Sequence, residues 1–115
     1  MTSKLPTTTR EEETDEGSLL PLITPGEFLA EEFLNPLGLS ANALALALRV
    51  PATRIQAIVN GQRAITADTA LRLGQYFGTT AEFWVNLQST YELDKAKREK
   101  LAEIMAQVQQ RSPVA

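Results

Sequence analysis

The side chains best suited to recognising a ligand lie in a short run between residues 52 and 57. The Gln56 amide can pair with adenine through one donor and one acceptor, and the Arg54 guanidinium has the matching geometry for guanine. An alanine or a threonine methyl packs well on the methyl group of thymine. This chemistry predicts contacts with DNA base edges by Ala52, Thr53, Arg54, Gln56 and Ala57. For Arg54, a phosphate contact or a solvated charge is an equally good interpretation.

A second set of polar residues flanks that run and suits phosphate groups. Amides at a helix N-terminus and the side chains of Ser, Asn, Gln, Thr and Arg bind phosphate oxygens without reading base sequence. We expect this role for Ser40, Asn42, Asn60, Gln62, Arg63 and Thr66. Two of them also fit simpler roles, because Asn60 is suited to ending a helix and Thr66 to capping the next one.

Two short helices must present these side chains at a fixed angle. The first helix follows Ser40, an N-capping residue. Pro51 interrupts the first helix and suits the first turn of the second. The second helix closes at Gly61. The inward-facing positions recur at helical spacing and are Leu44, Ala45, Leu48, Ile55, Ile58 and Val59. A small residue at position 45 lets the helices cross closely, which completes a helix-turn-helix pattern that presents one helix to a DNA major groove. An ordinary packing corner with no ligand is the alternative interpretation.

The turn between these helices departs from the usual pattern at Arg49. Glycine is usual there in helix-turn-helix proteins, because the backbone often needs a positive φ angle. A non-glycine residue in that conformation costs roughly 1 kcal/mol. We therefore expect either a strained turn or a turn of a different shape.

The net charge of −3 is unevenly distributed along the chain. Residues 1–23 carry −3 and residues 24–39 carry another −3, whereas residues 40–65 carry +3 through Arg49, Arg54 and Arg63. DNA affinity depends on neutralising phosphates, so the positive charge falls on the segment that should bind. Because +3 is modest, we expect strong site-specific binding to need two copies on one duplex.

Composition argues against an enzyme and against membrane association. The chain has no His and no Cys, which removes the usual zinc ligands, the commonest general base and any disulfide. No pair of carboxylates has a recognisable catalytic arrangement. We expect no cofactor, no metal and no small-molecule substrate. No apolar run approaches the roughly 18 residues of a membrane span, and the N-terminus lacks a secretory signal pattern, so a cytoplasmic location is expected.

The segment before the helix-turn-helix predicts a first helix. Thr24 and Glu27 have the spacing of a capping box, with a proline in the first turn. Asn35-Pro36 should end this helix, because a residue before proline disfavours the helical conformation.

Two further helices follow the helix-turn-helix, which makes five in an all-α fold. One begins at a capping Thr66, has Asp68 in its positive first turn and ends at Gly78. The last begins at Thr80 and either runs long or breaks near Ser89-Thr90. No stretch alternates as a strand would.

By composition, the chain divides into a disordered acidic tail (1–17), a helix-turn-helix domain (18–94) and a C-terminal helical extension (95–115). The extension carries an apolar stripe that nothing left in the chain would cover, so a partner should cover it, either a second copy of the chain or a different protein. The candidate interface residues are Trp84, Tyr91, Leu101, Ile104, Met105 and Val108. For Trp84, a place in the core is the commoner interpretation in so small a domain.

Residues 23–93 resemble the HigA family of antitoxins. The resemblance rests on TPGEFLAEEFLNPLGLS at 24–40, the helix-turn-helix, ITADTALRLGQYFGTTAEFWVNLQ at 65–88 and the YEL that follows, of which the third is the most specific. It implies a lambda-repressor-like homodimer that binds palindromic operator DNA and represses its own operon. It also implies a HigB-like toxin partner, similar to ribosome-associated mRNA endonucleases, which the antitoxin silences. The acidic tail and Arg49 depart from the family's usual pattern.

Two other functions remain open from the sequence. The chain is either a stand-alone transcriptional regulator without a toxin, or a protein-interaction module in which the helix-turn-helix is vestigial. In the latter case, the acidic tail or the C-terminal stripe would do the binding.

Overall fold

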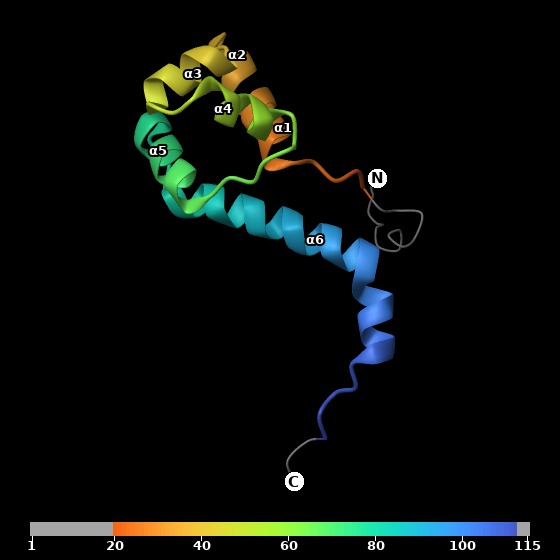
Figure 1. The fold of residues 1–115 in the computed structure, drawn as a ribbon. Coiled ribbons are helices and arrows are strands. Elements are labelled where there is room, and N and C mark those ends of the chain that lie inside the picture. The colour runs from red at the N-terminus through yellow and green to blue at the C-terminus, as the bar shows by residue number, and fades with distance from the viewer. Residues whose placement is uncertain (1–19, 113–115) are drawn as a thin grey trace, which may run out of the picture.

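The structure, a computed structural model that describes residues 20–112, has helices and no strands over that range (Figure 1). The helices are α1 (Pro25–Leu29), the π-helical η2 (Ala30–Leu34), α2 (Asn35–Leu37), α3 (Ala41–Leu48), α4 (Ala52–Val59), α5 (Ala67–Phe77) and α6 (Ala81–Gln107). Because α1, η2 and α2 follow one another without a break, they form one helical rod, and the predicted all-α fold of five helices is confirmed. The predicted acidic tail, residues 1–17, lies outside the described residues.

The first rod begins where the sequence predicts and ends later. The Thr24 hydroxyl accepts the Glu27 amide at 3.0 Å, and the Glu27 carboxylate accepts the Thr24 amide at 3.1 Å, which completes the expected capping box. The expectation that Asn35-Pro36 ends the helix is wrong, because the rod continues to Leu37. The π-helical turn explains this: the Asn35 amide reaches back to the Ala30 carbonyl, and the wider turn accommodates a proline that has no amide to donate.

The core draws on every helical rod. Its buried apolar residues are Leu29, Leu34, Leu44, Ala45, Leu48, Ile55, Ile58, Ile65, Ala70, Leu73 and Trp84. The Trp84 ring lies among other aromatic rings, with centroid distances of 5.1 Å to Phe33 and 5.0 Å to Phe83. Its indole N–H donates to Thr79 Oγ1 at 2.7 Å, which satisfies the only polar atom of the buried side chain.

The first rod crosses α4 at Gly26. A Cβ atom at this position would overlap the Ile58 carbonyl group, so only glycine allows the two backbones to approach this closely. Because α4 carries the predicted recognition side chains, Gly26 determines how deeply that helix sits against the rest of the bundle.

The last two helices differ at their starts. Thr80 caps α6 by accepting the Phe83 amide at 3.1 Å. Thr66 is at the N-cap position of α5, but the expected capping bond is absent, and its hydroxyl lies 3.5 Å from Thr69 Oγ1 instead. Helix α6 runs from Ala81 to Gln107 without the alternative break near Ser89-Thr90, and it extends away from the bundle (Figure 1). No helix within residues 20–112 has the length and apolarity to cross a membrane.

Candidate nucleic-acid interface

The turn between α3 and α4 closes through Arg49 in the left-handed conformation. Its φ is 62° and its ψ is 45°, so the strained version of the predicted turn is the one observed. The Val50 amide donates to the Ala45 carbonyl at 3.0 Å, and the Arg49 amide donates to the Leu46 carbonyl at 3.2 Å. These are the two bonds of a Schellman motif, which glycine usually closes. They set the direction in which α4 leaves Pro51, its N-cap residue.

Helix α4 packs its apolar face against the bundle and turns its polar face outward. Ile55 and Ile58 are fully buried, and α4 contacts both α3 and α1. Gly61, at which the sequence predicts this helix to close, is in the left-handed conformation, with φ at 76°. The Gln62 amide then donates to the Ala57 carbonyl at 2.8 Å, which gives α4 the same type of ending as α3.

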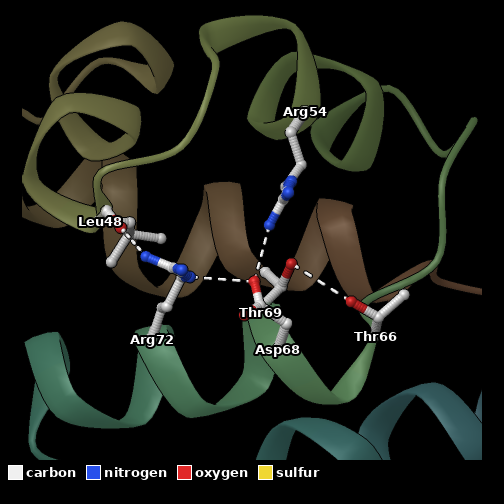
Figure 2. Close-up of polar contacts among 6 residues, drawn as sticks. All are labelled: Leu48, Arg54, Thr66, Asp68, Thr69 and Arg72. Atoms are coloured by element: carbon white, nitrogen blue, oxygen red, sulfur yellow. Dashed lines mark hydrogen bonds and ion pairs between the residues drawn. The ribbon is translucent and has the colours of Figure 1, made fainter.

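The predicted base-reading residues separate into three groups. Thr53 and Gln56 are exposed on the outer side of α4, while Ala52 and Ala57 are half-buried beside them. Arg54 is half-buried and belongs to the opposite edge of the helix, where it faces α5 (Figure 2).

The exposed Gln56 side chain is tied to the first helix of the pair. Gln56 Nε2 donates to Asn42 Oδ1 at 3.0 Å, which joins a predicted base contact on α4 to a predicted phosphate contact on α3. Both residues are predicted DNA contacts, but the bond between them cannot be predicted from the sequence, because it depends on the crossing angle of the helices.

Arg54 is part of an ionic cluster between three helices. Its Nη1 donates to Asp68 Oδ2 at 2.8 Å, and Arg72 Nε donates to the same oxygen at 2.9 Å. Arg72 Nη1 then donates to the Leu48 carbonyl at the end of α3, at 2.9 Å (Figure 2). The alternative of a plain solvated charge is therefore wrong for this structure, because the guanidinium joins α4 to α5. The predicted contacts of Arg54 with guanine or with phosphate stay predictions.

The two arginines change the acidity of the carboxylate that they share. Hydrogen bonds from Arg72 and then Arg54 hold the pKa of Asp68 below its ordinary value of 3.8. Asp68 and Arg72 therefore belong to the site's scaffold, a role that was not predicted from the sequence. Their spacing of four residues on one helix was the available signal.

The predicted phosphate-contacting residues all have exposed side chains. Ser40 caps α3 by accepting the Ala43 amide at 3.0 Å, and Asn60 is the C-cap residue of α4. The others are spread on both sides of α4: Asn42 on α3, and Gln62, Arg63 and Thr66 after it. Arg49, exposed at the turn, adds a cation to this face, as the charge distribution of residues 40–65 predicts. No group of three possible metal ligands occurs in the part of the chain that the structure describes.

The predicted interface residues do not form one surface. Trp84 is fully buried, so its assignment to an interface is wrong and its alternative place in the core is confirmed. Tyr91 is half-buried beside α1. The predicted apolar stripe is uncovered within residues 20–112: the exposed fractions are 43% for Leu101, 45% for Ile104, 69% for Met105 and 65% for Val108.

Comparison with known families and curated proteins gives two findings. A family described as helix-turn-helix matches residues 31–84. The chain is 57% identical over 81 residues to Virulence-associated protein I of Dichelobacter nodosus. The aligned region covers 70% of this chain and 75% of that protein.

Solved structures give a second set of similarities. A Pseudomonas aeruginosa antitoxin, HigA, determined with the higBA promoter, is 46% identical, with a TM-score of 0.75 over 77% of this chain and 97% of that one. The antitoxin GraA in complex with its operator is 40% identical, with a TM-score of 0.76 over 82% of this chain and 95% of that one. Both similarities extend over nearly the whole of the solved chains.

Proposed function

The chain belongs to the HigA family of helix-turn-helix antitoxins, and we propose that it is the antitoxin of a type II toxin–antitoxin pair. As a homodimer it binds operator DNA in front of its own operon and represses it. It also binds a HigB-like toxin, an mRNA endonuclease, and silences it.

The observation that carries this proposal is the outward placement of Thr53 and Gln56 on α4. The opposite face of that helix is buried, so α4 presents these two side chains to a ligand without exposing its apolar residues. An exposed polar face on the second helix of a helix-turn-helix is the arrangement that enters a major groove. Relatives with this fold were determined with promoter or operator DNA, which supports the same use here.

We assign base contacts to Thr53 and Gln56, with Ala52 and Ala57 packing against the bases. Arg54 is left out of this group because its guanidinium is held by Asp68.

Phosphate contacts are assigned to residues on both sides of α4. Those before it lie at the start of α3 and in the turn, and those after it lie in the segment that leads to α5. The residues are Ser40, Asn42, Arg49, Asn60, Gln62, Arg63 and Thr66. In this role they fix the position of the helix along the groove.

A dimer is expected because one recognition helix contacts too few base pairs to define an operator. One α4 helix reads only a few base pairs, whereas a two-fold dimer reads two half-sites about 34 Å apart. The exposed apolar stripe on α6 is the surface that we assign to the second copy.

In this function the chain itself catalyses nothing, because RNA cleavage would belong to the toxin. A bacterial operator and a cytosolic mRNA endonuclease also place the proposed activity in the cytoplasm.

DNA binding is tested by titrating the full chain against the DNA upstream of its gene and against a scrambled duplex, at two salt concentrations. We expect upstream DNA to bind about a thousandfold more tightly or better, and both affinities to fall as salt rises. Equal affinities for the two duplexes would contradict the repressor function and favour a protein-interaction module.

The toxin partner is tested by expressing the neighbouring reading frame with and without this chain. We expect growth arrest with the neighbour alone and recovery with both. A chain that binds operator DNA but has no such neighbour would be a stand-alone regulator.

A further inference from the structure

The bond between Asn42 and Gln56 joins the two helices of the helix-turn-helix at their exposed surface. The residues are fourteen positions apart, one on the first turn of α3 and one in the middle of α4, and both side chains are exposed. An isolated glutamine side chain on a surface samples many rotamers, and ordering it on a ligand costs free energy. The 3.0 Å bond to Asn42 Oδ1 restricts the Gln56 amide before any ligand arrives.

The atoms left over after this bond are the ones that DNA recognition needs. Gln56 retains one N–H and its Oε1, which are the donor and acceptor that match N7 and N6 of adenine. Asn42 retains both N–H groups of Nδ2, which can donate to a phosphate oxygen near the N-terminus of α3. The pair therefore has free groups for a base edge and for the backbone at the same time.

We propose that Asn42 is a positioning residue for base reading by Gln56, so that one phosphate contact and one base contact act as a single unit. This inference rests on the proposed function. Its consequence is that a residue assigned to the sequence-independent backbone also determines sequence preference at one base pair.

The experiment is a base-pair scan of the upstream operator with the wild-type chain, Gln56→Ala, Asn42→Ala and the double variant. We expect Gln56→Ala to lose about tenfold or more of its discrimination at one base pair in each half-site. Asn42→Ala should lose most of the discrimination at that same base pair, although it removes no group that touches the base. The double variant should discriminate no worse than Gln56→Ala alone, because the two side chains act together.

Asn42→Asp separates the two roles of Asn42. A carboxylate still accepts the hydrogen bond from Gln56 Nε2, so the preference at that base pair should remain. Its negative charge repels phosphate, so affinity should fall for every sequence alike. Asn86→Ala, an exposed change on α6, serves as the matched control and should leave both affinity and preference unchanged.

Three results would overturn the inference. The first is wild-type discrimination in Asn42→Ala at the base pair where Gln56→Ala loses it. The second is a loss in the double variant equal to the product of the two single losses, which indicates independent contacts. The third is no base pair at which Gln56→Ala loses preference. If the wild-type chain itself prefers no sequence, the proposed function fails first and this inference fails with it.

Discussion

The Asp68 carboxylate accepts hydrogen bonds from two arginines that lie on different helices, and these bonds hold both guanidinium groups in place. Arg54 comes from α4 and Arg72 from α5, and both donate to the same carboxylate oxygen. Since Arg72 also donates to the end of α3, one acidic side chain connects both helices of the helix-turn-helix to α5. Arg54 therefore joins α4 to α5 in this structure.

Asp68→Asn should weaken both folding and operator binding. The substitution keeps an oxygen acceptor but removes the charge that holds Arg54, so we expect the melting temperature at pH 7 to fall by a few degrees. Because folding lowers the pKa of Asp68, its ion pairs stabilise the protein above pH 3.8, and that contribution is lost as the pH falls through the folded-state value. Denaturant titrations of both proteins at several pH values should show the difference between them shrinking below pH 3.8.

The control for Asp68 is Asp94→Asn, an exposed change on α6. We expect a far smaller effect on melting at pH 7. A difference between wild type and Asp68→Asn that stays constant down to pH 2 would contradict the ionic explanation.

Arg49→Gly should stabilise the fold. The left-handed conformation at φ 62° is strained by about 1–2 kcal/mol in a residue with a Cβ. Glycine relieves that strain, and its greater freedom in the unfolded chain offsets part of the gain, so we expect a net gain of about 0.5–1 kcal/mol in the free energy of unfolding. Denaturant titration measures it.

Arg49→Ala separates backbone strain from charge. Alanine removes the same charge but retains the Cβ, so its stability should stay below that of Arg49→Gly. Equal stabilisation by both substitutions would assign the effect to charge and not to φ.

At the scale of helices, local sequence signals predicted where each helix begins. The capping residues Thr24, Ser40 and Thr80 all accept the amide three residues on, as their side-chain chemistry predicts. The helix end predicted at Pro36 was wrong, because the π-helical turn before it, in which the Asn35 amide donates to the Ala30 carbonyl, was not predicted from the sequence.

The candidate site shows the same division between local and long-range effects. Exposure of Thr53 and Gln56 follows from the period of α4 alone. The partners of Arg54 and Gln56 do not, because Asp68 and Asn42 each lie fourteen residues away and meet them only once the helices have packed.

Gly26→Ala should damage the fold by separating two helices. A methyl group at Gly26 overlaps the Ile58 backbone, which cannot move without shifting α4. We expect a loss of about 3 kcal/mol in the free energy of unfolding, measured by denaturant titration.

Gly38→Ala is the matched comparison for Gly26→Ala. It strains a residue with φ at 62° but meets no atom within 4 Å, so it should cost only about 1–2 kcal/mol. Equal losses from the two substitutions would show that the close crossing at Gly26 is not what the fold depends on.

At the scale of the whole molecule, the two ends of α6 have different surroundings. Its N-terminal turns bury Trp84 in the core, and its C-terminal turns extend beyond the bundle with apolar side chains uncovered in the described chain (Figure 1). The stripe can therefore be changed without disturbing the helix-turn-helix.

Leu101→Lys combined with Ile104→Lys should disrupt the proposed dimer while leaving the fold intact. Both side chains are about half exposed, so lysine is tolerated in the single chain but introduces charge into the interface. We expect sedimentation to show monomers and operator affinity to fall at least tenfold, toward that of one half-site. Ala102→Lys with Ala106→Lys adds the same charge to another side of α6 and should remain dimeric. Dimers from the first variant would place the interface elsewhere.

Trp84 gives the molecule a built-in optical reporter. It is the chain's single tryptophan, and it is fully shielded from solvent, with its indole held by Thr79. Its emission should therefore be that of an apolar environment in the native state and shift to longer wavelength when the chain unfolds. Because the indole lies inside the bundle, neither an added duplex nor a second copy should contact it. A shift in its emission wavelength would therefore report unfolding and not association.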